Sequence, residues 1–558
     1  MTQKTNYSIM KTHQKGGPAM KKLKSLLFHP NTGILLYLLF YFLVSLLFLT
    51  DFPWVHSDES WLAGLTRNMM EANDFSVTEA FFDARPRYPH AIKILFHALQ
   101  MVLISLFGYG ITAVRMLSLL ASVVSLFFFY LTAKKLSGQS LTAFFLTILF
   151  SFDIQFIYTS HMARQESLLL LSLTLCLWLF FQGTSPNTLR RGILLGIVTG
   201  LSVGLHPNSF LLACMVGCCY LAWYMTHRGE SKKPLAAYVG TTGVFALFFV
   251  ILSYCFDPQF LMHYFANGAD EFGIDAAPGD RLSGLFGFFK RLFLRQGGTY
   301  YVAELRPQFL LFGFAAALLL CFFLVMRKEA ETKETCSRIL ALLGSAFGII
   351  AGIFFIGRFS QLSIIFLFPA GWLMVSYVLA LFEPITERIC YAALLLIMCL
   401  INISCIRPYL SGETYEHYLT QVASYAAPED AVIANLNTDF YFENGSLHDY
   451  RNLPYVMQAD GSLDSYIEEN KIEYIFYTAE LSYYYEHRPY YNALYGNIMF
   501  AEDLLRYCEE KCVFVGSFRN ARYAPRILEL IDREEFAEVR VYKTNYADCD
   551  SGHFPTKH

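Results

Sequence analysis

Two adjacent carboxylates, Asp58 and Glu59, follow closely on a long apolar run in the sequence. Residues 32–50 are almost wholly apolar, which is enough to cross a bilayer. The lysines within residues 21–24 place the N-terminal end of this run in the cytoplasm. The two acids therefore emerge on the far side of a membrane. A carboxylate at that boundary can act as a general base between a membrane-borne group and an external acceptor.

A second group of polar residues lies in the segment 160–166, between two further apolar runs. A guanidinium such as that of Arg164 can hold a phosphate through two hydrogen bonds. Glu166 would stand near a helix N-terminus, which favours negative charge. His161 belongs to the same group. The alternative is that Arg164 only anchors a helix end by reaching toward water.

Two other sites carry polar residues at the ends of apolar runs. His206 precedes Pro207, which can stop a helix and leave the histidine facing a cavity. A structural corner between two helices explains this pair nearly as well. Arg358 follows another apolar run on the same outer side and is a candidate for phosphate contact.

The composition indicates an integral membrane protein. Of 558 residues, 55% are hydrophobic and 16% are charged, against roughly 25% charged in soluble domains. The net charge of −3 gives no indication of a nucleic-acid partner. Near the C-terminus, Cys508 and Cys512 could form a disulfide or stay as free thiols.

Apolar runs of spanning length predict eleven transmembrane helices, and the basic loops between them fall on the side of the N-terminus. Residues 91–108 are left out, because counting them would invert every later loop. Lys93, His97 and Gln100 recur there at helical spacing, which predicts an amphipathic helix in the outer interface. The eleven runs are 32–50, 111–133, 141–159, 167–183, 191–205, 208–226, 235–255, 307–326, 339–356, 362–382 and 389–407.

The predicted organisation has three parts. Residues 1–31 form a cytoplasmic tail, and residues 32–407 form the membrane domain. Beyond Pro408 the apolar runs shorten to strand length, so residues 408–558 are expected to form an extracytoplasmic α/β domain of ordinary size. In this domain we expect strands at 431–434 and 474–477 and a helix near 502–508. The two large outer loops of the membrane domain are 51–110 and 256–306.

The order of these motifs resembles the GT-C glycosyltransferase superfamily. The resemblance is closest to protein O-mannosyltransferases and bacterial aminoarabinose transferases, the family 39-like group. Where members often carry Lys-Pro-Pro, this chain has Tyr88-Pro89-His90. Arg87 or Lys93 could replace the missing lysine. The resemblance rests on Asp58-Glu59, on Tyr88-Pro89-His90-Ala91-Ile92-Lys93 with Leu106-Phe107-Gly108, on Ala113-Val114-Arg115-Met116-Leu117-Ser118 and on Ala163-Arg164-Gln165-Glu166.

The resemblance implies an inverting glycosyltransferase of the plasma (inner) membrane, with its active site and C-terminal domain outside the cytoplasm. Its partners would be a polyprenyl-phosphate sugar donor, membrane lipid, and a glycan, lipid or protein acceptor. The leaving phosphate needs cationic stabilisation more than a general acid. The expected roles are Asp58 as base with Glu59 as its neighbour and possible substitute, Lys93, Arg164, Arg358 and Arg87 at the phosphate, and His56, His161, Glu166 and His206 around the sugar or acceptor.

No cofactor is required by this reading, although a divalent cation could bind weakly to the paired outer acids. Two other functions remain open at this stage. One is a flippase or transporter of lipid-linked sugars, although the chain shows neither the repeated halves nor the broken helices typical of transporters. The other is a non-catalytic membrane assembly protein whose C-terminal domain binds a partner.

Overall fold

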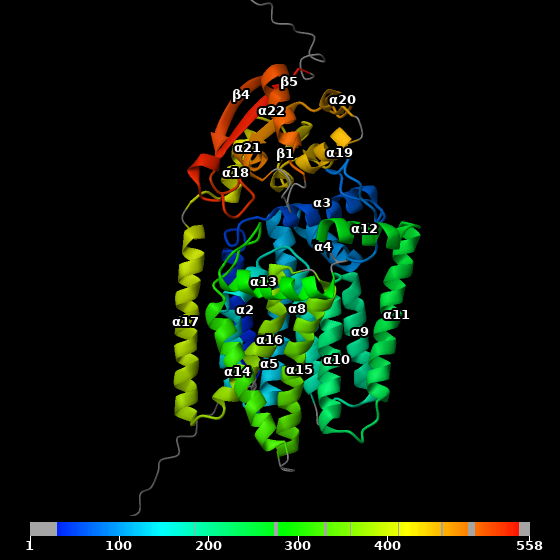
Figure 1. Ribbon diagram of the computed structural model, residues 1–558. Helices are drawn as coiled ribbons and strands as arrows, with labels where there is room; N and C mark the ends of the chain where they lie inside the picture. The colour runs from blue at the N-terminus through cyan, green and yellow to red at the C-terminus, as the bar shows by residue number, and fades with distance from the viewer. Residues whose placement is uncertain are drawn as a thin grey trace, which may run out of the picture.

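The computed structural model shows a helical bundle with a smaller domain, built on a β-sheet, at one end (Figure 1). This is the predicted fold class, a polytopic helical membrane protein with a C-terminal α/β domain. Nearly all of the predicted cytoplasmic tail lies outside the described residues. These are 31–182, 185–272, 277–327, 332–357, 359–410, 412–458, 461–488 and 497–545.

All eleven predicted spans coincide with helices. Within the described part of the chain, seven helical segments are long and apolar enough to cross a membrane, and a bent pair would make eight. The remaining three helices are shorter, with 16, 16 and 13 residues. The number eleven therefore remains a prediction. The seven are α5 (Ile111–Ser137), α10 (Ser209–Thr226), α11 (Lys233–Phe256), α14 (Arg306–Met326), α15 (Lys333–Ile356), Gln361–Leu379, which ends in α16 (Phe368–Leu379), and α17 (Pro384–Leu410); the pair is α6 (Ser140–Ser151) with α7 (Ile154–Ser160), bent by 69°; the short ones are α2 (Thr32–Leu47), α8 (Glu166–Phe181) and α9 (Leu189–Leu201).

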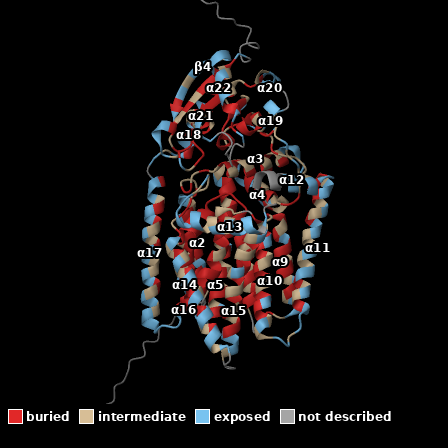
Figure 2. Cartoon of the chain, in the orientation of Figure 1, coloured by how far each residue is buried: buried red, intermediate tan, exposed pale blue. Residues whose placement is uncertain are grey.

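The outermost helices expose apolar side chains. Only 11% of the most apolar stretch of α11 is buried, against 61% of that of α5. Figure 2 shows exposed residues along α11 and α17 and buried ones along the helices in the middle of the bundle. Because water would not favour such surfaces, these helices face the hydrocarbon of a bilayer.

The two predicted outer loops fold into four shorter helices at the end of the bundle that carries the sheet domain (Figure 1). The first loop forms α3 (Ser57–Ala72) and α4 (Ile94–Phe107), and the second forms α12 (Phe260–Phe272) and α13 (Pro278–Phe293). In Figure 1, α12 and α13 lie across the long helices.

Helix α4 is amphipathic as predicted, but its polar face points inward. His97 is hydrogen-bonded to the Thr66 hydroxyl of α3 (2.8 Å), which also donates to Gln100. The face that α4 exposes is apolar. Polar side chains along one face of a helix can form hydrogen bonds with a neighbouring helix as well as with water. Here they bond to α3, and the apolar face of α4 faces the lipid. The exposed large apolar residues are Leu99, Val102, Leu106 and Phe107, and Ser105 lies among them.

The C-terminal domain contains, in the described residues, a five-stranded mixed sheet of order β2-β1-β3-β5-β4. Strands β2, β1 and β3 run parallel, whereas β5 is antiparallel to both of its neighbours. The predicted strands coincide with β1 and β3, and the predicted helix with α22. The elements are α18 (Tyr415–Ala423), β1 (Val432–Ala434), β2 (Leu447–Asp449), α19 (Leu453–Gln458), α20 (Leu463–Glu469), β3 (Tyr474–Thr478), α21 (Ala479–His487), α22 (Phe500–Lys511), β4 (Cys512–Arg519) and β5 (Glu538–Thr544).

Two local details differ from expectation or settle an open alternative. Helix α17 does not stop before Pro408 but continues to Leu410. A proline near a helix end loses few backbone hydrogen bonds, which explains why it is tolerated. Cys508 and Cys512 are both free thiols in the structure.

A buried ion pair joins the C-terminal domain to α3. Arg67 of α3 donates to the Asp439 carboxylate and to the Phe442 carbonyl, each at 2.7 Å. Tyr109 donates to the same carboxylate, and the Arg67 guanidinium lies 4.3 Å from the centre of the Tyr109 ring. The domain therefore helps to fix the helix that carries the candidate acids.

Candidate active site

The N-terminus of α3 is fixed by a capping box. His56 is the N-cap, and its Nδ1 accepts a hydrogen bond from the Asp58 backbone N–H (3.0 Å). The Glu59 side chain accepts in return from the His56 backbone N–H (2.9 Å). This reciprocal arrangement satisfies amide groups that a helix start leaves open. It places both carboxylates in the first turn, where they point in different directions.

Glu59 points into the protein and is fully enclosed. Arg115 of α5 donates to both of its carboxylate oxygens (2.7 and 2.8 Å), and the Ala163 backbone N–H donates as well (2.7 Å). Both side chains of the pair have no exposed area. Glu59 thus ties α3 to α5 and to the segment before α8. This position argues against the expectation that Glu59 could replace Asp58 as base, because no space beside it admits a substrate.

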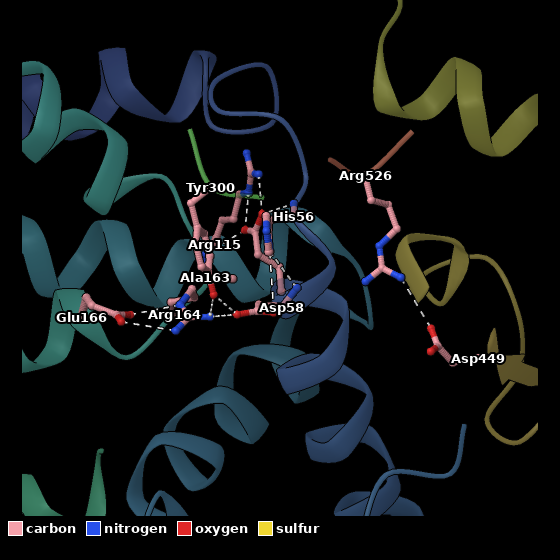
Figure 3. Close-up of polar contacts among 10 residues, drawn as sticks. His56, Asp58, Arg115, Ala163, Arg164, Glu166, Tyr300, Asp449 and Arg526 are labelled. Atoms are coloured by element: carbon pink, nitrogen blue, oxygen red, sulfur yellow. Dashed lines mark hydrogen bonds and ion pairs between the residues drawn. The ribbon is translucent and has the colours of Figure 1, made fainter. Parts of the chain in front are cut away.

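Asp58 points the other way and lies at a cavity. Its carboxylate forms an ion pair with Arg164 and accepts a hydrogen bond from the Tyr300 hydroxyl (Figure 3). Burial by itself raises the pKa of this carboxyl, but the Arg164 guanidinium, together with smaller effects of His56, the Tyr300 hydroxyl and Arg451, holds the pKa below its usual range. The side chain keeps 21% of its area exposed, so it is both charged and accessible.

Arg164 is held between two carboxylates, as Figure 3 shows. Its Nε and Nη2 donate to Glu166 (3.2 and 3.3 Å), while Nη1 donates to Asp58 and to the Tyr300 hydroxyl (2.9 Å). Glu166 is the first residue of α8 and is buried. The predicted closeness of Asp58, Arg164 and Glu166 is therefore present in the structure.

The cavity beside Asp58 has a volume of about 460 Å³. Five of the sequence-predicted site residues line it, although α3, α4 and the segments before α8 and α10 are far apart in the sequence. One side of the cavity is apolar and is formed by α12 and the end of α15. The predicted residues are Asp58, Arg87, Lys93, Arg164 and His206, and the apolar ones are Phe260, Phe265, Phe355 and Ile356.

Lys93 occupies an unusual backbone conformation at the edge of this cavity. It is the N-cap of α4 with φ of +124°, a region that residues with a Cβ rarely adopt. Such strain persists only where the surroundings impose it and is concentrated at functional sites. The conformation therefore adds to the interest of Lys93 as a residue that contacts a ligand.

Arg87 lines the cavity but is already engaged. Its Nε and Nη2 donate to the two oxygens of Glu79, each at 3.0 Å. Burial raises and Arg87 lowers the pKa of Glu79, and the net result is a pKa of about 2. Glu79 also accepts from the Trp61 indole N–H. This pairing makes Arg87 a weaker candidate for phosphate contact than Lys93 or Arg164.

His56 and His161 do not line the cavity. His56 caps α3 and stacks on the Tyr300 ring, with 4.4 Å between ring centres. His161 is hydrogen-bonded through Nδ1 to the Phe52 carbonyl (3.1 Å), and burial lowers its pKa to about 4. Both are better explained as structural than as the expected pocket residues. Arg358 lies outside the described residues.

The structure adds residues that the sequence did not single out. Tyr300 contacts both Asp58 and Arg164, and it lies two residues after the Gly297-Gly298 turn of the second outer loop. His263 of α12 is hydrogen-bonded through Nδ1 to the Asp257 carboxylate (2.6 Å) and stacks on Tyr88 with 3.6 Å between ring centres, at another wall of the cavity. The Gly297-Gly298 turn is visible in the sequence and could have drawn attention to this loop. The contacts of Tyr300 with Asp58 and Arg164 could not be read from the sequence.

The paired outer acids do not fit a divalent cation. The Asp58 and Glu59 carboxylates each face a guanidinium, and they point in different directions. In the part of the chain that the structure describes, no group of three or more metal-ligand side chains comes together. The donor set at this site is therefore suited to anions rather than to a metal.

Comparison with known proteins agrees with this architecture. Residues 90–254 match the family model described as dolichyl-phosphate-mannose-protein mannosyltransferase. ArnT from Cupriavidus metallidurans, solved bound to undecaprenyl phosphate, aligns with a TM-score of 0.58 over 92% of this chain and 98% of its own, at 12% identity. The chain has the GT-C fold. The predicted resemblance to GT-C membrane glycosyltransferases is thus confirmed.

A second GT-C structure aligns over most of the chain. It is the oligosaccharyltransferase AglB from Archaeoglobus fulgidus, in complex with an inhibitory peptide and a dolichol-phosphate. The TM-score is 0.50 at 12% identity, covering 87% of this chain and 73% of AglB. At these identities the likeness to GT-C structures shows the fold. Sequence comparison with curated proteins found no match.

Proposed function

We propose that this protein is an inverting glycosyltransferase that moves a sugar from a polyprenyl-phosphate donor to an acceptor outside the cytoplasm. The observation that carries the proposal is one cavity lined by Asp58, Arg164 and Lys93 at the end of the bundle where the C-terminal domain sits. It combines a carboxylate that can accept a proton with cations that can hold a phosphate.

In this mechanism, Arg164 and Lys93 bind the donor phosphate and Asp58 is the base. Asp58 takes a proton from the acceptor as the acceptor atom bonds to the anomeric carbon. The bond from that carbon to the phosphate oxygen breaks on the opposite face, and its electron pair leaves with the polyprenyl phosphate. The cations stabilise the charge that grows on the phosphate, so they act most strongly in the transition state.

The shape of the cavity suits a lipid-linked headgroup. Its volume of about 460 Å³ is within the roughly 300–1,000 Å³ typical of small-molecule sites. The apolar side chains of α12 and α15 form a wall along which a polyprenyl chain could pass into the bilayer. His206 and the aromatic residue Trp61 also line the cavity, and in this proposal they contact the sugar.

Two further observations support the lipid class and the side of the membrane. The aligned ArnT and AglB structures hold undecaprenyl phosphate and a dolichol-phosphate. The positive loops of the sequence fall at the end opposite the cavity in the predicted topology, which supports a cavity outside the cytoplasm.

The test is to incubate the purified full-length protein with a panel of polyprenyl-phosphate sugars and a set of glycan, lipid and peptide acceptors. We expect release of polyprenyl phosphate together with labelled acceptor for one donor class, and neither with Asp58→Asn. A transporter would move the donor between leaflets of a proteoliposome without cleaving it. If the protein moves donors between leaflets and cleaves none of them, the transporter function would replace the enzymatic proposal.

A further inference from the structure

The base and the phosphate-binding cation of the proposed mechanism are bound to each other at the edge of the cavity. Arg164 Nη1 donates to Asp58, and Tyr300 donates to the same carboxylate oxygen. A carboxylate in such an arrangement is a weak base, because both contacts stabilise its charged form. A guanidinium in such an arrangement also has fewer N–H groups available to bind another anion.

The hydrogen bonds of Arg164 leave little room for a further anion. Of the five N–H groups of an arginine, four have acceptors here, two of them on Glu166 and one each on Asp58 and Tyr300. A phosphate that takes a bidentate grip must therefore displace one of these acceptors. The structure distinguishes the two carboxylates by access, because the Glu166 side chain is 2% exposed and the Asp58 side chain 21%.

We propose that the donor phosphate and the Asp58 carboxylate compete for the Nη1 side of Arg164, so that donor binding releases Asp58 to act as the base. This inference rests on the proposed function. Glu166 keeps Arg164 in place during the exchange, since its two hydrogen bonds lie on the other side of the guanidinium. Asp58 then faces the cavity and keeps its hydrogen bond from the Tyr300 hydroxyl.

The exchange couples two events that an inverting transfer needs in sequence. Without donor, Asp58 is held by Arg164 and does not deprotonate an acceptor. With donor, the loss of the guanidinium lets the pKa of Asp58 rise toward that of an ordinary carboxyl, which strengthens it as a base. When the sugar leaves, the phosphate gains a further negative charge and holds Arg164 more tightly. The proton acceptor is therefore available only while a donor is present.

The competition predicts that removing the charge of Asp58 tightens lipid phosphate binding. We would measure equilibrium binding of undecaprenyl phosphate to the full-length protein in nanodiscs at pH 7. Asp58→Asn should bind about tenfold more tightly than wild type, which corresponds to one charge-assisted hydrogen bond. Asp58→Ala should behave similarly, so the result does not depend on how one variant folds.

Asp257→Asn is the matched control. It removes the same charge from the same cavity, but its carboxylate pairs with His263 and not with Arg164. Its affinity should stay within about twofold of wild type. Unchanged or weaker binding by the Asp58 variants, or an equal gain in Asp257→Asn, would overturn the competition. If wild type and all variants fail to bind undecaprenyl phosphate, the proposed function fails instead.

A kinetic readout tests the release of Asp58 itself. The acidic limb of kcat/KM for the donor reports the empty enzyme, whereas that of kcat reports the donor complex. The limb should therefore lie at higher pH for kcat than for kcat/KM. Coinciding limbs would contradict the release of the carboxylate by the donor.

Discussion

Two arginine–carboxylate pairs begin one residue apart on α3 and differ in almost everything else. Glu59 and Arg115 are sealed in the bundle with no exposed area, whereas Asp58 and Arg164 border a cavity. The sealed pair is completed by backbone groups, including the Ala163 N–H. The open pair is completed by a tyrosine from a distant loop. Identical chemical groups thus serve as a structural joint in one direction and as a candidate reaction centre in the other.

The contrast shows that access decides function here, more than residue type. A buried ion pair is costly to break, because the remaining charge has no solvent. A pair at a cavity can exchange its partner for a ligand of the same charge. Changing each member of the two pairs in turn should separate loss of activity from loss of fold.

The largest effect is expected from the open carboxylate. Asp58→Asn should reduce sugar transfer by about 10²–10⁴-fold, the usual contribution of a general base. Its melting temperature should change little, because Arg164 keeps its contacts with Glu166. Release of polyprenyl phosphate and thermal unfolding, measured on the same preparation, check this. Transfer at the wild-type rate would remove Asp58 from the mechanism.

The sealed carboxylate should behave in the opposite way. Glu59→Gln leaves Arg115 buried without its counter-charge, which is expected to destabilise the fold by about 3–5 kcal/mol. The yield of folded protein and its melting temperature would both fall, while any folded fraction keeps donor binding. Asp58→Asn serves as the matched control. A stable but inactive Glu59→Gln would reverse the roles assigned to the two acids.

A smaller effect is expected at Lys93, which lines the cavity without belonging to either pair. Lys93→Met should weaken undecaprenyl phosphate binding about tenfold, because one charge-assisted hydrogen bond to the phosphate is lost. Lys290→Met, on α13 and away from the cavity residues, controls for general loss of positive charge. Equal losses in both variants would indicate non-specific attraction of the anionic lipid.

The smallest effect concerns pH and the cap of α3. Burial lowers the pKa of His56 to about 4, and Asp58 only partly offsets this. Between pH 6.5 and 4, His56 is protonated in the unfolded chain but not in the folded protein. The free energy of unfolding therefore decreases as the pH falls, by at most about 1.4 kcal/mol per pH unit. His56→Asn keeps a good N-cap and should show a shallower decline of melting temperature over this range. An unchanged decline would show that other groups govern it.

The sequence predicted the parts of the fold whose signal is local. The spans follow from runs of apolar residues. The start of α3 was not predicted, although acids directly after His56 are typical of a helix N-terminus. The cluster of Asp58 and Arg164, 106 residues apart, could be anticipated because both lie at the same predicted membrane boundary. Membrane topology indicates at which depth of the bilayer each residue lies, and this is why the closeness of Asp58 and Arg164 could be predicted.

The remaining features depend on contacts that no local pattern encodes. Which of the two acids faces the cavity is decided by Arg115, which lies on another helix. The inward turn of the polar face of α4 is decided by Thr66. Tyr300 reaches Asp58 across 242 residues. Residue types and spacing could identify the candidates, but only the packing could divide them between structure and chemistry.

The most direct test is a structure of the full-length protein with a non-cleavable polyprenyl-phosphate sugar bound. The account predicts that the phosphate lies within hydrogen-bonding distance, about 3 Å, of Arg164 and Lys93. It also predicts that Asp58 is turned away from Arg164 toward the position of the acceptor, on the face of the anomeric carbon opposite the phosphate. A headgroup bound at the opposite end of the bundle, or one that leaves the contact between Asp58 and Arg164 intact, would contradict it.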